Sequence, residues 1–177
     1  MIILYVISDG GINNNTLDTI ESVMLTKNIK NIDGVKVDVR KTLDNIFVIS
    51  KYEELNKFTY GNGKISECNY DYLRKVKFPS HIFKYYIPTL EEILKRYNPE
   101  KIIVLEIYEI NELNKLFELL INYNYKYYFM SKDMNILNEL KKLEFNKIGI
   151  IINYDNVIEN TNTCENIFFI EEDISTK

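Results

Sequence analysis

The sequence predicts one α/β domain, residues 1–177, in which helices cover a mostly parallel sheet. Short apolar runs alternate along the chain with amphipathic segments whose apolar residues lie three and four positions apart. Hydrophobic residues make up 46% of the chain, and there are only six Gly and three Pro. This composition excludes disordered and fibrous proteins. The pattern alone leaves a doubly wound sheet and a TIM-type barrel open.

Seven runs are predicted to be strands because each is brief, rich in β-branched or aromatic residues, and bounded by polar residues. They span residues 2–8, 35–40, 46–50, 102–108, 125–130, 147–152 and 167–171. Such runs are typical of buried parallel strands.

Four amphipathic stretches between these runs are predicted to be helices. Their apolar stripes are Leu17, Ile20, Val23 and Met24; Leu90, Ile93, Leu94 and Tyr97; Leu113, Leu116, Phe117 and Leu120; and Ile136, Leu137, Leu140 and Leu143. The second stretch starts at a capping box, because Thr89 follows Pro88 and Glu92 comes three residues after Thr89. Residues 51–86 lack clear periodicity and are interpreted as an insertion between the third strand and its helix.

Charge and cysteine usage restrict the partners and the compartment. The formal charge is −4 with basic and acidic residues interleaved, which argues against a nucleic-acid binder. No apolar run approaches the ~20 residues of a membrane span, and the first apolar run is too short for a signal peptide. Cys68 and Cys164 lie far apart without metal-type spacing and are expected to be free thiols. A cytoplasmic protein without a membrane span is predicted.

A series of short motifs runs in order through the first three quarters of the chain. They are Ser8-Asp9-Gly10, Asn14-Asn15-Thr16, Lys36-Val37-Asp38-Val39, Thr42-Leu43-Asp44-Asn45, Lys51-Tyr52, Leu55, Gly61-Asn62-Gly63, Ile87-Pro88-Thr89-Leu90-Glu91-Glu92, Glu106-Ile107-Tyr108 and Ser131-Lys132-Asp133. Their order and spacing resemble the glycerophosphodiester phosphodiesterase family. The resemblance implies a TIM barrel and a metal-dependent phosphoric diester hydrolase of lipid metabolism, which releases glycerol 3-phosphate and an alcohol.

The chain departs from the family pattern at the reactive positions. The resemblance aligns Ser8 and Asp9 with a His-Arg pair, Lys36 with a metal-binding glutamate, and Lys51 with a second histidine. The family's two histidines serve as acid and base. Of its metal ligands, Asp38 and Glu106 remain, and they would hold Mg or Ca only if a metal is bound. The only histidine of the chain, His81, matches no motif position.

Strand parity indicates how these side chains lie. Lys36 and Asp38 share one face of their strand, and Glu106 and Tyr108 share a face of theirs. Lysine is almost never buried unpaired, so we expect its ammonium to lie between Asp38 and Glu106, where the cation would be. An ammonium is no Lewis acid, and Lys51 is a poor general base at neutral pH. No catalytic residue is therefore assigned.

Three functions remain open. The first is an inactive family member without a cofactor, which binds a small phosphate-containing or anionic ligand or a protein partner; its ligand-binding residues are Lys36, Asp38, Lys51, Glu106 and Tyr108. In that case Lys36 and Lys51 form an anion site; alternatively, Lys51 is simply solvated. The second is an active phosphodiesterase with a rearranged site, in which Asp9, Asp38, Glu106 and Asp133 gather Mg or Ca and Lys51 is the acid. The third is a structural scaffold.

The length of the chain predicts a shortened or incomplete barrel of about seven strands, because TIM barrels run ~250 residues. An open barrel exposes strand edges, which natural proteins cover. A second copy of the chain or a protein partner is expected to close it.

Overall fold

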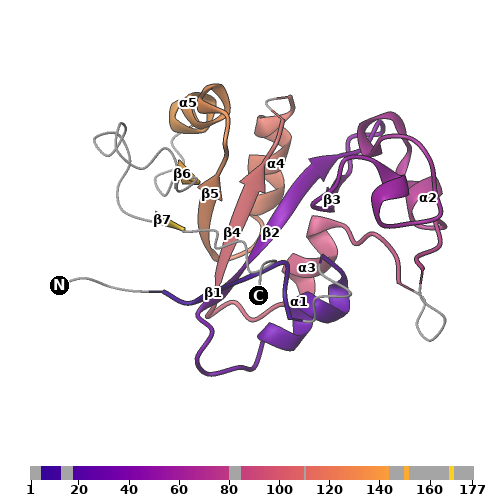
Figure 1. Cartoon of the computed structure of the whole chain (residues 1–177). Helices are drawn as coiled ribbons and strands as arrows, with labels where there is room; N and C mark the ends of the chain where they lie inside the picture. Colours follow the sequence, from indigo (N-terminus) through magenta and orange to yellow (C-terminus); the bar gives the residue numbers. More distant parts are fainter. Residues whose placement is uncertain are drawn as a thin grey trace, which may run out of the picture.

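A computed structural model of the protein describes residues 5–12, 18–79, 85–109, 111–143, 150–151 and 168–169. Its main sheet contains β1 (Ile7–Asp9), β2 (Gly34–Lys41), β3 (Phe47–Ile49), β4 (Ile102–Ile107) and β5 (Lys126–Met130) (Figure 1). Strands β1, β2, β4 and β5 lie side by side in that order and run parallel. Two short strands, β6 (Ile150–Ile151) and β7 (Phe168–Phe169), pair in parallel with each other.

The third strand corrects one prediction. Residues 46–50 contain a strand, but β3 pairs antiparallel with β2, so it is not one of the parallel strands. The turn before β3 explains this: Asn45 adopts a φ of 62°, which asparagine tolerates, and the Thr42 hydroxyl accepts a hydrogen bond from the Ile46 N–H. A tight turn joins antiparallel neighbours, whereas parallel neighbours need a longer crossover. The described strands thus form two separate sheets and no closed barrel.

The four predicted helices are present as α1 (Ile20–Thr26), α3 (Leu90–Arg96), α4 (Leu113–Leu120) and α5 (Met134–Lys142). Leu17, expected in the first stripe, lies outside the described residues. One face of the sheet packs on these helices in a single buried cluster that includes Val35, Val37, Val39, Ile103, Leu105, Leu90, Ile93, Leu116 and Leu137. The predicted capping box of α3 is confirmed. The Thr89 hydroxyl accepts from the Glu92 N–H at 3.0 Å, and the Glu92 carboxylate accepts from the Thr89 N–H at 2.8 Å.

The segment after β3 forms a small layer of its own beside the sheet (Figure 1). It contains two 3-10 turns, η1 (Leu55–Lys57) and η2 (Ile65–Glu67), and the short helix α2 (Tyr70–Leu73). A second buried cluster holds it together, made of Val48, Leu55, Ile65, Leu73, Val76 and Ile87. His81 and Cys164 lie outside the described residues, and Cys68 is a free, partly buried thiol. None of the described helices is long and apolar enough to span a bilayer.

Candidate functional site

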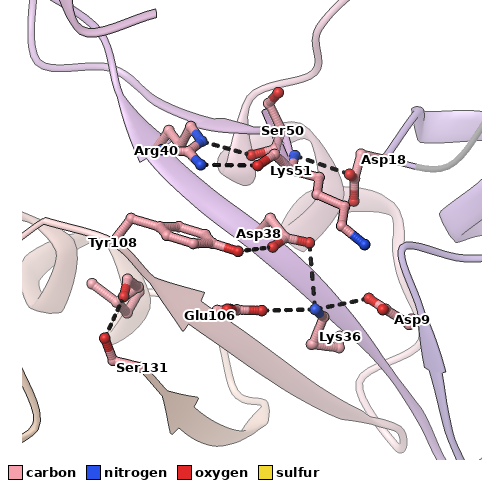
Figure 2. Close-up of polar contacts among 11 residues, drawn as sticks. Asp9, Asp18, Lys36, Asp38, Arg40, Ser50, Lys51, Glu106, Tyr108 and Ser131 are labelled. Atoms are coloured by element: carbon pink, nitrogen blue, oxygen red, sulfur yellow. Dashed lines mark hydrogen bonds and ion pairs between the residues drawn. The ribbon is translucent and has the colours of Figure 1, made fainter. Parts of the chain in front are cut away.

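Sheet register places four charged side chains beside one another. Asp9 on β1 is the register partner of Lys36 on β2, and Asp38 on β2 is the register partner of Glu106 on β4. Register partners on neighbouring strands project from the same face, as do residues two apart on one strand. The four side chains therefore lie opposite the helix-covered face, toward the carboxyl ends of the strands, where barrel enzymes hold their active sites (Figure 2).

The Lys36 ammonium is the centre of this cluster. Its Nζ lies 2.7 Å from Glu106 Oε2, 2.9 Å from Asp9 Oδ1 and 3.6 Å from Asp38 Oδ2. The side chain of Lys36 is only 8% exposed. The predicted placement of the ammonium between Asp38 and Glu106 is thus confirmed. Its contact with Asp9 makes it a shared counterion for three carboxylates.

The charge of Lys36 is fixed by these partners. Burial alone would lower the pKa of its ammonium, but the negative charges of Asp38, Asp9 and Glu106 outweigh burial and raise that pKa above the ordinary lysine value. Lys36 therefore remains protonated and offers no lone pair for nucleophilic or base chemistry.

Asp38 is bound on its other side by Tyr108. The Tyr108 hydroxyl donates to Asp38 Oδ1, and burial together with the nearby Asp38 charge raises the pKa of that hydroxyl. The Arg40 guanidinium lies 4.2 Å from the centre of the Tyr108 ring. Asp38 Oδ2 is buried and accepts no hydrogen bond from the rest of the described chain. Burial raises the pKa of Asp38 against the opposing effects of Lys36 and Tyr108.

Lys51 is held by its backbone rather than by its side chain. Its N–H donates to Asp18 Oδ2 at 3.0 Å, and its carbonyl accepts from Arg40 Nη2 at 2.8 Å. The side chain is exposed, and within the described residues its ammonium makes no ion pair or hydrogen bond (Figure 2). The two lysines thus differ: the carboxylates neutralise Lys36 and leave Lys51 unpaired.

Asp18 and Arg40 were missed by the sequence analysis. Arg40 shares strand parity with Lys36 and Asp38, so alternation alone could have placed it on their face. Asp18 belongs to no motif, and only the folded chain brings it near Lys51. Burial and the charges of Asp38 and Asp9 raise the pKa of Asp18 to about 7, whereas the Lys51 N–H and the Lys36 charge oppose the shift. One oxygen of Asp18, Oδ1, is buried without a hydrogen-bond partner in the described chain.

Two other predicted site residues have local structural roles. The Ser8 hydroxyl donates to the Gly11 carbonyl at 2.6 Å. Asp133 is exposed and caps α5, where its carboxylate accepts from the Asn135 N–H at 2.8 Å. Asp133 therefore serves the start of a helix, and the carboxylates that surround Lys36 are Asp9, Asp38 and Glu106.

The residues present do not fit the divalent cation that the family resemblance implies. In the part of the chain that the structure describes, no three histidine, cysteine, aspartate or glutamate side chains are placed to hold a metal ion. The carboxylates of Asp9, Asp38 and Glu106 converge on an ammonium instead, and ammonium groups donate hydrogen bonds but accept none.

Known structures have the same architecture. A phosphodiesterase from Agrobacterium tumefaciens str. C58 is 17% identical with a TM-score of 0.74, covering 86% of this chain and 68% of that one. One from Thermotoga maritima is 23% identical with a TM-score of 0.72, covering 90% and 67%. An Oleispira antarctica phosphodiesterase, solved in complex with the product sn-glycerol-3-phosphate, is 23% identical with a TM-score of 0.71, covering 85% and 66%. These likenesses confirm a TIM-type fold in shortened form.

The chain spans about two thirds of the length of these three structures. A comparison with curated proteins gives no match. A model of one family, described as the glycerophosphoryl diester phosphodiesterase family, matches residues 10–146, which is most of the sequence. The chain therefore belongs to the glycerophosphoryl diester phosphodiesterase family.

Proposed function

We propose that this protein is a catalytically inactive member of its family, which binds a small phosphate-containing or other anionic ligand without cleaving it. The observation that carries the proposal is the Lys36 ammonium, 2.7 Å from Glu106 and 2.9 Å from Asp9. It lies among the carboxylates that would otherwise be available to a catalytic cation.

The side chains at the other reactive positions support the proposal. Cleavage of a phosphodiester needs a proton donor for the leaving group and a base for the nucleophile. The Ser8 hydroxyl donates a hydrogen bond to a backbone carbonyl. The Lys36 ammonium cannot coordinate a phosphoryl oxygen and a nucleophilic hydroxyl together, as a Lewis-acidic metal does. A protein with this fold can therefore still bind a ligand after it has lost the groups that cleave a phosphodiester.

Lys51 is the residue we propose as the anchor for an anion. Hydrogen bonds to Asp18 and Arg40 fix its backbone, and its ammonium has no partner within the described residues. Lys36, Asp38, Glu106 and Tyr108 are joined by ion pairs and a hydrogen bond and are proposed to shape the site. Because Lys36 is already neutralised, the attraction for a phosphate group comes from Lys51.

A hydrolysis assay tests the loss of catalysis. The purified protein is incubated with a glycerophosphodiester and millimolar Mg or Ca, and glycerol 3-phosphate is measured against an active phosphodiesterase. We expect no release above buffer. The second candidate is an active hydrolase, and the convergence of Asp9, Asp38 and Glu106 on one point favours it. Release of glycerol 3-phosphate that the substitution Asp38→Ala abolishes would establish this candidate instead.

Calorimetry with glycerol 3-phosphate and with inorganic phosphate tests binding. We expect saturable binding that Lys51→Gln weakens. Lys57→Gln is the matched control, because Lys57 is another exposed lysine at a nearby position in the sequence. Equal affinities of the two variants for the ligand would show that Lys51 is not part of the binding site. The absence of any binding would leave the scaffold function.

The open sheet supports a further part of the proposal, that a second copy or a protein partner completes the barrel. Among the described strands, β1 pairs only with β2, and β5 has a ladder only with β4. Unpaired strand edges template association. Sedimentation velocity over a range of concentrations tests self-association. If the protein stays monomeric at every concentration, a second copy does not complete the barrel, and only a different protein partner could do so.

A further inference from the structure

The insertion, residues 51–86, differs in charge from the rest of the protein. It contains seven lysine or arginine residues and four aspartate or glutamate residues, whereas the whole chain contains 22 and 26. In Figure 1 this segment lies beside the carboxyl end of β2, with α2 on its outer side. The protein therefore has a region that an anionic surface attracts, although the net charge of the chain is −4.

Exposed tyrosines occur in the same segment. The tyrosines that are exposed among the described residues are Tyr52, Tyr60 and Tyr72, at 47%, 68% and 45%, and all three lie in the insertion. The other described tyrosines are buried or half-buried. One exposed apolar ring on a protein surface is ordinary, but a concentration of such rings in one basic segment indicates an interaction surface.

Two stretches of the insertion are held against each other. The Tyr60 N–H donates to the Lys77 carbonyl at 2.8 Å. Next to this bond Gly61 packs on Val76, because a Cβ at Gly61 would lie 2.8 Å from Val76 Cγ1. The backbone at Tyr60 is thus fixed beside the backbone at Lys77.

Tyr72 and two cations complete this surface. The Tyr72 hydroxyl accepts from the Asn62 N–H at 3.4 Å, so it lies at the turn that follows Tyr60. Arg74 and Lys77 are exposed, and neither forms an ion pair within the described residues. We call Tyr60, Tyr72, Arg74 and Lys77 the basic aromatic patch.

We propose that the basic aromatic patch is a docking surface for an anionic lipid bilayer. Tyrosine is enriched at the level of the lipid headgroups, where its apolar ring and polar hydroxyl are both accommodated. The negative surface of such a bilayer attracts the neighbouring cations. Asp71, the acidic residue closest to Arg74 in the sequence, is already paired with Lys75 at 2.6 Å.

This inference goes beyond the proposed function, because docking of the patch requires no ligand at Lys51. The patch also lies outside the cluster around Lys36. Lys51 begins the same insertion, so docking would bring the proposed anion anchor toward the lipid headgroups.

Sedimentation with vesicles tests the inference on the full chain. The probes are vesicles of phosphatidylcholine alone and vesicles in which one third of the lipid is phosphatidylserine, both in chelator. We expect the protein to sediment with the anionic vesicles and to stay in solution with the neutral ones. High salt should release it, because salt screens the attraction between exposed charges.

Two variants separate the contribution of the cation from that of the ring. Lys77→Gln should weaken partitioning onto anionic vesicles by roughly fivefold and reduce its salt dependence. Tyr60→Ser should also weaken partitioning but keep the salt dependence, because it removes apolar area and no charge. Neither change touches the hydrogen bond between these residues, which joins backbone atoms. Lys30→Gln and Ile121→Ser are the matched controls, because both residues are exposed outside the insertion, and they should bind like the wild type.

The proposal would be overturned if the wild type sedimented equally with neutral vesicles. It would also be overturned if the wild type stayed in solution with anionic vesicles, which would leave the patch to a protein partner. Wild-type partitioning of both patch variants, or an equal loss in the control variants, would overturn it as well. None of these readouts uses a phosphate ester in solution, so the proposed function and this inference can fail separately.

Discussion

Glu106 accepts a 2.7 Å hydrogen bond from the Lys36 ammonium, although the two residues stand 70 positions apart in the sequence. Both side chains are almost fully buried, at 3% and 8% exposed. Taking two charges out of water costs free energy that their attraction only partly returns, so such a pair is weak grounds for stability by itself. Removing one partner is different, because the other charge is then left buried and uncompensated.

Lys36→Met should therefore destabilise the protein strongly. The substitution leaves Asp9, Asp38 and Glu106 without their shared counterion, and loss of one member of a buried pair typically costs about 3–5 kcal/mol. The measurement is urea unfolding in the presence of a chelator. Lys64→Met, which removes a half-exposed ion pair with Glu53, should cost about 1 kcal/mol or less. Similar losses in the two variants would contradict a central role for Lys36.

Glu106 and Asp9 should couple to Lys36 unequally. Glu106 is buried and bonded at 2.7 Å, whereas Asp9 is 47% exposed at 2.9 Å, so solvent screens the Asp9 pair. Double-mutant cycles of Lys36→Gln with Glu106→Gln and with Asp9→Asn measure both couplings from urea unfolding. We expect about 2–3 kcal/mol for Glu106 and less than about 1 kcal/mol for Asp9. A larger coupling of Lys36 to Asp9 than to Glu106 would show that solvent exposure does not determine the strength of these ion pairs.

Local pattern was sufficient to predict the elements that carry the site. Alternation placed Lys36 and Asp38 on one face and the valines on the other, and the spacing of Thr89 and Glu92 predicted the cap of α3. Both follow from periodicity and hydrogen-bond chemistry within a few residues. The direction of β3 was predicted wrongly because its composition resembles that of a buried parallel strand, whereas the turn at Thr42 and Asn45 sets its direction.

The contacts that depend on the folded chain were harder to predict. The role of Asp9 as a second partner of Lys36 depends on the register of β1 against β2, which no local signal specifies. Asp18 contacts Lys51 although the two residues lie 33 positions apart in the sequence. Asp18 also adopts a positive φ of 62°, and the residues around it give no clear signal for that conformation. Long-range register and loop geometry are thus what the sequence analysis lacked.

Tyr108→Phe should weaken the cluster from its other side. The substitution keeps the ring under Arg40 but removes the hydroxyl that donates to Asp38. Hydrogen bonds to charged groups contribute about 1.5–3 kcal/mol, so urea unfolding should show a loss in that range. Tyr60→Phe, at a tyrosine that is 68% exposed, should change stability by less than about 0.5 kcal/mol. If Tyr108→Phe left the free energy of unfolding unchanged, Asp38 would have to accept a hydrogen bond from another donor.

Asp18 should make the stability of the protein depend on pH. In the folded chain its pKa is about 7, against an ordinary value of 3.8. Between these values the folded state binds more protons than the unfolded state, so the free energy of unfolding falls as pH rises from about 4 to about 7. One such group contributes a slope of at most about 1.4 kcal/mol per pH unit. The stabilisation is greatest at the acid end of this window and is lost above pH 7.

Asp18→Asn should remove this contribution. An asparagine is neutral at every pH, and its side-chain oxygen can accept the Lys51 N–H as the carboxylate does. Urea unfolding at a series of pH values should therefore give a flatter profile for the variant, which is more stable than the wild type at pH 8 and closest to it near pH 4. Asp71→Asn, at an exposed residue paired with Lys75, should follow the wild-type profile. If Asp18→Asn kept the wild-type slope, the Asp18 carboxyl would titrate in the ordinary range, and burial beside Asp38 would not govern its proton.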